Sequence, residues 1–364
     1  MRPIMKDVVW DRVGDDVRLV YDRRDHFLLN DPGGTVERLL TLLREGGRTV
    51  PELAETLSLP GEVISARDVV AAVEVLDEYR LVEDGDRLGR LDASAAERYQ
   101  SNLAFFASFA TLARSREDLH LSLRDAHVLV LGTGGFNSST VQHLCGLGVG
   151  KLTLVDRDTV EAPNFARQYL YRWSDLGASK VRRAGAWVRA YAPEVEVESI
   201  DLSVDNLHDV EQLLDGTRPT FVLSGMDSPR EISDWVNWAC VSRGIPYVRG
   251  GVFVSQGIVY SVDPGRSACQ ACGSAQLAAL ATNEAANEAS AMELFRTKAR
   301  TNPAIGPVTG LLGSLAAFEM LRYLTAFEPP AYAGAPLIVD FAANCSTTGT
   351  SWRRDPDCPA CSGR

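Results

Sequence analysis

The sequence of 364 residues predicts an α/β protein in which a mainly parallel sheet follows a small α+β domain. The first observation is an apolar run of strand length, His127 to Leu131, that passes directly into the glycine turn Gly132 to Gly135. The second is a helix-compatible segment closed by Gly150 and followed by an apolar strand that ends in Asp156. Strand, glycine turn, helix, strand and terminal acid within about 30 residues are the layout of a nucleotide-binding βαβ unit. We therefore expect a Rossmann-like domain over residues 126–364.

The glycine turn is expected to bind the phosphates of a nucleotide. Gly132, Gly134 and Gly135 let backbone N–H groups approach a phosphate at the start of a helix, and Asp156 can hold ribose hydroxyls. The side chain of Asn137 could hydrogen-bond a phosphate, or it could cap the helix, because Asn is a preferred N-cap residue. The glycines alone are a weak signal, so the class of nucleotide depends on the residues that follow.

A dense polar string begins at Asp156 and reads Asp156-Arg157-Asp158-Thr159-Val160-Glu161-Ala162-Pro163-Asn164-Phe165-Ala166-Arg167-Gln168. A dehydrogenase has no need of such a string. The amide of Asn164 and the cations of Arg167 and Lys180 are expected near the phosphates, where the two positive charges would help to neutralise a triphosphate.

These segments resemble the adenylating superfamily that includes the thiamine- and molybdopterin-pathway adenylyltransferases and the ubiquitin-activating enzymes. The resemblance implies an ATP site built from the glycine turn and from Asp156, Asp158, Asn164, Arg167, Gln168 and Lys180. Within it, Asp156 would hold the ribose, and Asn164, Arg167 and Lys180 would face the phosphates. Relatives usually have glycine where this chain has Asn137.

Asp227 is the expected catalytic residue. It follows a strand at 220–224 by way of Gly225-Met226, and a carboxylate just past the end of a strand lies in the crevice where open α/β sheets bind ligands. Mg²⁺ prefers carboxylate oxygens together with substrate phosphates. The resemblance implies that Asp227 binds magnesium and is essential for adenylation. The alternative is a turn or N-cap aspartate ahead of a helix at 231–242.

Four cysteines form two C-x-x-C pairs, Cys269 with Cys272 and Cys358 with Cys361. Two such pairs supply the four thiolates of a closed structural zinc site. The 85 intervening residues exceed the usual zinc-ribbon spacing, so the pairing of the two knuckles is what the resemblance implies. The alternative is a redox role, which two knuckles in Gly-, Ser- and Pro-rich loops make less favoured than zinc.

Residues 1–90 are expected to form the small α+β domain. Three strands are predicted at 8–10, 17–21 and 26–29, and three helices at 35–45, 49–56 and 66–79. The tail Arg80 to Glu83 resembles the wing of a winged-helix fold, so the domain is winged-helix-like. Residues 1–91 carry 13 Lys and Arg against 19 Asp and Glu, a net charge of −6, whereas DNA binding calls for a basic face.

In order and length this segment also resembles the domain that binds leader peptides in enzymes of ribosomal peptide maturation. Such domains capture a peptide by adding it to a sheet edge. A structural or dimerisation role is the remaining alternative.

Residues 91–125 are expected to link the two domains. Arg98-Tyr99-Gln100-Ser101-Asn102 resembles a segment that precedes the glycine turn throughout the superfamily, which places Arg98 in the nucleotide site. The second arginine of that pattern, which in relatives can reach ATP in a partner subunit, is Ser101 here, so this contact is absent or is made by Arg114 or Arg116. An amphipathic linker helix with Tyr99, Phe105, Phe106 and Phe109 packed inward is the alternative. We expect a homodimer.

The segments 234–241 and 245–251 look most like the microcin C adenylating branch of the superfamily. We therefore expect an ATP-dependent adenylyltransferase that activates a carboxylate of a ribosomally made peptide and releases pyrophosphate. The alternatives are activation of a ubiquitin-like sulfur carrier, or a scaffold that only delivers leader peptide to a partner cyclodehydratase.

The remaining observations bear on location and on covalent chemistry. The net charge of −11 argues against nucleic acid or membrane as a main partner, and the absence of a signal-like apolar opening favours a cytoplasmic protein. Residues 276–304 suggest a mobile segment that crosses the active site. No cysteine lies between Gly273 and Asp340, so adenylation without an enzyme thioester is expected, and Cys345 is the plausible free thiol.

Overall fold

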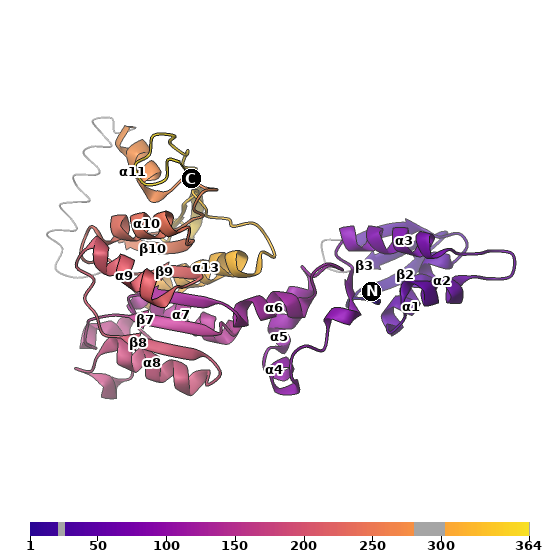
Figure 1. Cartoon of the computed structure of the whole chain (residues 1–364), viewed down its shortest axis with the longest axis horizontal. Coiled ribbons are helices and arrows are strands. Elements are labelled where there is room, and N and C mark those ends of the chain that lie inside the picture. Colours follow the sequence, from indigo (N-terminus) through magenta and orange to yellow (C-terminus); the bar gives the residue numbers. More distant parts are fainter. Residues whose placement is uncertain (21–25, 280–302, 364) are drawn as a thin grey trace. The chain divides into compact units, whose positions relative to one another are not determined.

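The computed structural model describes residues 1–20, 26–279 and 303–363. It divides into two compact units, Met1–Ser122 and Leu123–Arg364 (Figure 1). Residues 91–122, expected to be a linker, therefore belong to the first unit.

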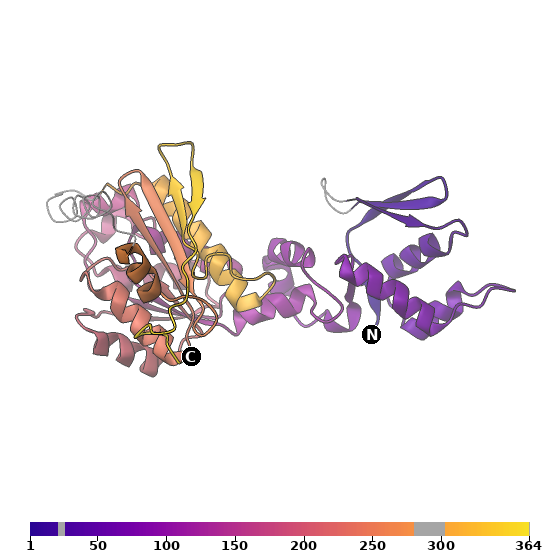
Figure 2. The same ribbon diagram turned by 90° about the horizontal axis from the view of Figure 1, so that it is seen from above.

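The described part of residues 9–78 in the first unit contains a three-stranded antiparallel sheet and three helices (Figure 2). The sheet has the order β2-β3-β4, and the helices carry a buried apolar core against it. The bounds are β2 Val9–Val13, β3 Asp16–Val20, β4 His26–Asn30, α1 Thr35–Glu45, α2 Val50–Leu57 and α3 Ala66–Glu78. Capping boxes begin α2 at Thr49 and α3 at Ser65. All three predicted helices are thus present, close to their expected bounds.

The segment Arg80 to Glu83, which resembles a wing in the sequence, contributes to a strand that does not join the three-stranded sheet. β5, Val82–Asp84, pairs antiparallel with β1, Pro3–Met5. Beside this pair, buried Lys6 donates to the carbonyl oxygens of Arg80 at 2.7 Å and Ala110 at 2.5 Å, and the carboxylate of buried Glu83 pairs with Arg116. These contacts fasten the 107–116 segment to the first 90 residues.

The expected linker forms short helices, α4 Ala93–Arg98, α5 Gln100–Ala107 and α6 Arg116–Arg124, after the 3-10 turn η1 Gly85–Arg87. Tyr99 and Phe106 are buried as predicted. Phe105 is exposed, so the alternative in which it packs inward is wrong for this residue, whose ring lies on the outside of the helix at 5.7 Å from that of Phe106 and 5.2 Å from that of Phe109.

The second unit is organised on an eight-stranded sheet with the order β13-β12-β11-β10-β9-β6-β7-β8. Strands β10, β9, β6, β7 and β8 are parallel, and β11, β12 and β13 add in antiparallel fashion. The bounds are β6 His127–Leu131, β7 Lys151–Val155, β8 Glu196–Ile200, β9 Phe221–Ser224, β10 Tyr247–Phe253, β11 Gln256–Val262, β12 Leu337–Asp340 and β13 Ser346–Gly349. The chain runs outward from β6 through β7 to β8 and then returns to the other side of β6. β6 and β9 thus define a topological switch point.

Helices cover both faces of this sheet. The bounds are α7 Gly135–Leu147, α8 Lys180–Tyr191, α9 Leu207–Thr217, α10 Ile232–Arg243, α11 Gln270–Ala279 and α13 Gly306–Thr325, with 3-10 turns η2 Ala162–Ala166 and η3 Trp173–Asp175. Apolar residues of α7, α8 and α13 share one core with one face of β6 and β7, and those of α9 and α10 share a second core with the other face.

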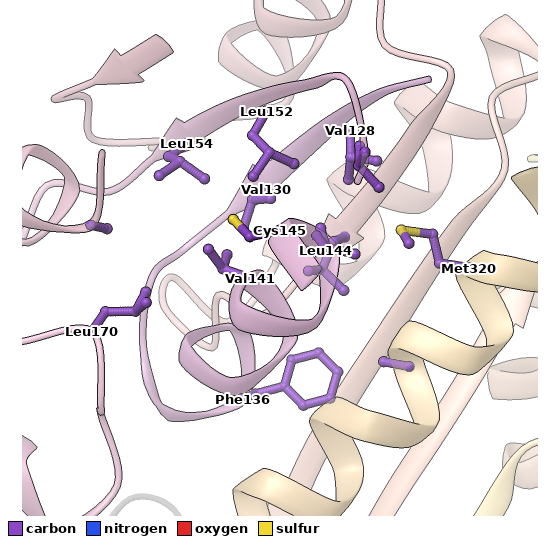
Figure 3. Packing of buried hydrophobic residues seen from close by; sticks show 14 of the residues in the cluster. Val128, Val130, Phe136, Val141, Leu144, Cys145, Leu152, Leu154, Leu170 and Met320 are labelled. Carbon is purple, nitrogen blue, oxygen red and sulfur yellow. The ribbon is translucent and has the colours of Figure 1, made fainter. Parts of the chain in front are cut away.

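The alternation along β6 explains these two cores, since Val128 and Val130 enter the first and Leu129 and Leu131 the second. Figure 3 shows Val141 of α7 in the first core. Helix α7 ends at Gly148, whose φ of 79° is left-handed, two residues before the glycine expected to close it.

Within the described residues no helix combines the length and the apolar character that crossing a membrane requires.

Candidate functional site

Three segments that carry predicted site residues follow strands that end side by side in the sheet. Leu131, the last residue of β6, is paired with Val155 of β7 and with Ser224 of β9. The glycine turn, Asp156 and the residues Gly225-Met226-Asp227 each follow one of these three strand ends. They therefore meet at the carboxyl edge of the sheet, at the switch point where open α/β sheets bind ligands.

The glycine turn contacts the loop after β9 directly. Gly132 has a left-handed φ of 85°, and a Cβ atom there would lie 3.1 Å from Cγ of Met226. The left-handed backbone and this close approach both call for glycine at that position.

Asp156 holds the glycine turn. Its carboxylate is buried, and Oδ2 accepts hydrogen bonds from the backbone N–H of Thr133 at 2.6 Å and from the Thr133 hydroxyl at 2.9 Å. Oδ1 accepts the N–H of Asp158 at 2.9 Å. Three of about four acceptor positions on the carboxylate are thus used inside the protein, and one is left for a ligand such as a ribose hydroxyl.

Sequence reasoning missed two members of this network, Thr133 and Tyr171. The Tyr171 hydroxyl lies 2.8 Å from both the carbonyl oxygen and the hydroxyl oxygen of Thr133. Burial raises the pKa of Tyr171 well above its ordinary value, so the phenol stays protonated and can donate. A hydroxyl residue between the first two glycines was the signal available for Thr133, whereas nothing local marks Tyr171.

Asn137 lies inside helix α7 and does not cap it. The N-cap is Gly134, without a side-chain cap bond, so the capping interpretation is wrong. The Asn137 amide instead donates to the carbonyl oxygens of Leu131 at 3.0 Å and Gly132 at 2.7 Å. In the structure these two hydrogen bonds hold the glycine turn against the end of β6.

The polar string folds over the start of α7. Asn164 is buried, and its Oδ1 accepts the N–H of Glu161 at 2.9 Å, which closes the turn η2. The side chain of Arg167 crosses the helix start, because a Cβ on Gly135 would lie 3.0 Å from its Cγ. Gln168 is buried beside Gly134, and its Oε1 has no hydrogen-bond partner among the described residues. An unpaired acceptor beside the glycine turn accepts an N–H or O–H of a ligand, whereas a phosphate oxygen needs a donor, which the amide nitrogen of Gln168 provides.

Lys180 pairs with Asp158 at 2.9 Å. The lysine side chain is 8% exposed and the aspartate side chain 56%, so the pair lies at the mouth of the site. Both residues line a cavity of about 350 Å³ together with Arg157, Thr159 and Glu161. Lys180 was expected to face a phosphate, and the carboxylate of Asp158 is its anionic partner in the structure.

A larger cavity of about 440 Å³ lies elsewhere, among Leu214, Asp215, Arg218, Pro219, Arg243 and Ile245. Arg218 and Pro219 precede β9, so this cavity opens at the amino edge of the parallel strands. The candidate site is at the opposite edge, and the chemistry described above is absent from the residues that line this cavity.

Asp227 is exposed, and its carboxylate forms no ion pair with any described residue. Arg98 ends α4 in the first unit, with its guanidinium 5.6 Å from the Tyr99 ring centroid. The structure therefore brings together the glycine turn, Asp156, Asp158, Asn164, Arg167, Gln168 and Lys180, with Asp227 at the adjoining strand end, all within the second unit.

The four cysteines of the two knuckles converge. Their Sγ atoms all lie within 4.8 Å of one another, with Cys269 at 3.9 Å from Cys272 and 3.7 Å from Cys358, and Cys272 at 3.5 Å from Cys361. A zinc ion about 2.3 Å from four sulfurs at tetrahedral angles holds them about 3.8 Å apart, whereas a disulfide needs about 2.0 Å. The donor set therefore fits a tetrahedral metal.

Neighbouring N–H groups are placed to donate hydrogen bonds to the cysteine sulfurs, which stabilises the thiolate form that binds a metal. The Asn237 amide lies 3.8 Å from Sγ of Cys269, and the N–H of Asp355 lies 3.5 Å from Sγ of Cys272. Asn237 is itself held by Tyr247 and by the N–H of Gln270, both at 3.0 Å from its Oδ1. Groups of this kind orient ligands around a metal.

A sequence model described as the ThiF family matches residues 107–360. The chain belongs to the ThiF family. The SAMP-activating enzyme E1 of Haloferax volcanii is 29% identical over 247 residues, which cover 66% of this chain and 81% of that protein. The molybdopterin-synthase adenylyltransferase of Salmonella typhimurium is 28% identical over 244 residues, which cover 66% and 88%.

Solved structures resemble this ThiF-family chain in fold over nearly its whole length. Escherichia coli MccB, solved with AMPCPP and MccA, has a TM-score of 0.76 at 19% identity and covers 99% of this chain and 100% of its own. The ThiF-family chain is an ATP-dependent adenylyltransferase. The expected superfamily and the Rossmann-like fold with a mainly parallel sheet are confirmed.

Proposed function

We propose that this protein transfers AMP from ATP to a carboxylate of a ribosomally made peptide and releases pyrophosphate. One observation carries the choice of a peptide: the fold of MccB covers the whole chain, first unit included, whereas the sequence relatives that activate carrier proteins match two thirds of it. MccB has been solved with its precursor peptide MccA in N-formylated form.

The nucleotide would bind at the switch point. The first N–H groups of α7 have no acceptor within the helix, so they are available to the phosphates of ATP above Gly132, Gly134 and Gly135. The remaining acceptor position of Asp156 would take a ribose hydroxyl. Arg167, Asn164 and Gln168 would surround the phosphates.

Lys180 would change partners when ATP arrives. In the structure its ammonium is neutralised by Asp158 at 2.9 Å. A triphosphate carries more negative charge than one carboxylate, so it would compete for the lysine, and Asp158 would be released toward the solvent or the ribose. The exchange would let Lys180 attract ATP. Before ATP binds, Asp158 neutralises the lysine, so the empty site does not contain an unpaired buried charge.

Asp227 would hold Mg²⁺ against the phosphates. Its exposed carboxylate, free of ion pairs with described residues, fits an ion that binds through one or two carboxylates and substrate phosphates. When bound, the metal neutralises charge that develops as pyrophosphate leaves. The protein's own contribution is to position the two substrates and to stabilise charge.

Zn²⁺ would occupy the four-cysteine cluster. It would tie the 352–361 tail to the start of α11, with no part in the reaction, because all four ligands come from the protein and no open position remains.

The peptide would add to the edge of β4. This strand pairs with β3 on one side, and its Phe27 ring lies 4.5 Å from that of Tyr79, just after α3. Val75 and Tyr79 are four residues apart on one side of the helix and are 44% and 48% exposed. An extended peptide on β4 would place alternate side chains over these two residues.

The test is peptide-dependent ATP–pyrophosphate exchange, with synthetic peptides encoded beside this gene as substrates. Replacing Val75 by Glu together with Tyr79 by Ala should raise the KM for peptide about tenfold or more and leave the KM for ATP unchanged. Val9→Glu is the matched control, since Val9 is also exposed, at 64%, and lies on β2, the opposite edge of the same sheet. An equal loss in both variants would contradict the assigned edge.

Activation of a ubiquitin-like carrier is the second candidate, favoured by the names and the 28–29% identity of the sequence relatives. A carrier ending in Gly-Gly would then support exchange where no peptide does. Exchange with neither would favour the leader-peptide scaffold. A homodimer is part of the proposal, and light scattering would measure it as twice the mass of one chain.

A further inference from the structure

We propose that Asn137 and Arg249 clamp the loop Ser224–Met226 from two sides and so position Asp227 for its metal. The inference rests on the proposed role of Asp227. Both residues hold the loop through hydrogen bonds and contacts within the protein, so both would act as positioning residues.

Asn137 joins the end of β6 to the loop. The carbonyl oxygen of Leu131 accepts two hydrogen bonds, from Nδ2 of Asn137 at 3.0 Å and from the N–H of Gly225 at 2.9 Å. Nδ2 also donates to the carbonyl oxygen of Gly132 at 2.7 Å. The buried amide thus bonds to the glycine turn and shares the Leu131 carbonyl with Gly225, the second residue of the loop.

The loop lies directly on this amide. A Cβ atom on Gly225 would be 2.6 Å from Nδ2 and 2.7 Å from Cγ of Asn137, so only a residue without a side chain fits there. Asn137 is 1% exposed and its Oδ1 has no hydrogen-bond partner among the described residues. A glycine at position 137 would leave a gap beneath Gly225.

Arg249 holds the same loop from the neighbouring strand. It is paired with Ser224 in the register of β10 and β9. Its Nη1 donates to the Ser224 hydroxyl at 2.8 Å and its Nη2 to the carbonyl oxygen of Met226 at 2.7 Å. Both acceptors are neutral, and both belong to the residues that lead into Asp227.

The two contacts fix the loop relative to the glycine turn. Asn137 restrains Gly225, and Arg249 restrains Ser224 and Met226, so all three residues before Asp227 are held. The carboxylate is then presented at a set distance from phosphates bound on the turn. A misplacement of about 1 Å at such a site can cost on the order of 100-fold in rate, which gives this clamp a function.

The test measures metal affinity apart from activity. Mn²⁺ is titrated by electron paramagnetic resonance into full-length protein saturated with ATP, and ATP binding is measured separately in EDTA by calorimetry. Asn137→Ala and Arg249→Met should each weaken Mn²⁺ about tenfold, the effect of losing a buried hydrogen bond. Metal-free ATP binding should stay within about twofold of wild type in Arg249→Met, whereas Asn137→Ala should also weaken ATP because it loses the hydrogen bond to Gly132 of the glycine turn. Arg249→Lys, which keeps one donor, should fall between.

Two comparisons keep the outcomes separate. Thr140→Val removes a buried hydroxyl from the same helix that does not contact the loop. Its Mn²⁺ affinity should equal that of wild type, and a lower affinity would show that any loss of a buried hydrogen bond in this helix weakens the metal. Asp227→Asn tests the proposed function in the same assay. Weak Mn²⁺ binding in Asp227→Asn with wild-type affinity in the Asn137 and Arg249 variants would overturn the clamp alone, and wild-type affinity in Asp227→Asn would overturn both proposals.

Discussion

The carboxylate of Asp156 accepts two hydrogen bonds from Thr133, one from its backbone N–H at 2.6 Å and one from its hydroxyl at 2.9 Å. The end of β7 thereby sets the conformation of the turn after β6. Tyr171, 38 residues along the chain from Thr133, donates to the same residue and completes the support of the turn.

Thr133→Val should weaken ATP binding by about two- to tenfold, because it removes the hydroxyl bonds to Asp156 and Tyr171 at nearly constant volume. Calorimetric titration with ATP measures this. Thr153→Val is the control, since it removes a buried hydroxyl from the adjoining strand β7 that contacts His127 and not the turn. Equal ATP affinity in wild type and Thr133→Val would show that the network does not shape the site.

One zinc per chain is expected from the four-cysteine cluster. Cys358→Ser should release the metal and lower the melting temperature by several degrees, because a structural site couples metal binding to folding. Elemental analysis and thermal melts measure both quantities. Cys345→Ser is the control, since Cys345 is an exposed thiol outside the cluster. Full zinc content in Cys358→Ser would contradict the assignment.

Lys6 gives the first unit a pH dependence. Burial lowers the pKa of Lys6 from 10.5 to about 8, with the charges of Glu83 and Arg116 acting in opposite directions. Between pH 8 and 10.5 the unfolded chain holds a proton that the folded chain has released, so the free energy of unfolding should rise with pH.

Lys6→Met lacks this titration and should show a smaller rise. Denaturant melts of both proteins from pH 7.5 to 10 measure the difference. Parallel pH profiles for the two proteins would mean that Lys6 keeps its ordinary pKa.

Much of the second unit could be predicted from local signals. The apolar run before Gly132, the acid at Asp156 and the strand before Asp227 each mark a strand end within a few residues, and parallel strands bring those ends to one edge. The cysteine pairs are equally local. Their convergence across 85 residues followed from resemblance, since spacing alone does not say which knuckles meet.

The partners of individual side chains could not be predicted in this way. The residue type of Asn137 suits a phosphate contact or an N-cap, yet the N-cap is Gly134, three residues earlier, and the amide of Asn137 donates to the carbonyl oxygen of Leu131 at the end of β6. The pairing of Lys180 with Asp158 and the contact of Tyr171 with Thr133 depend on how distant turns pack. Such contacts leave no periodic signal in the sequence.

The most direct test of the account is peptide-dependent ATP–pyrophosphate exchange by wild type and Asp227→Asn. The substitution removes the charge and keeps the shape, so ATP should still bind through the glycine turn and Asp156. Exchange should fall about 100-fold or more, because a metal held on developing charge contributes several kcal/mol. Exchange by Asp227→Asn at close to the wild-type rate would contradict the central claim.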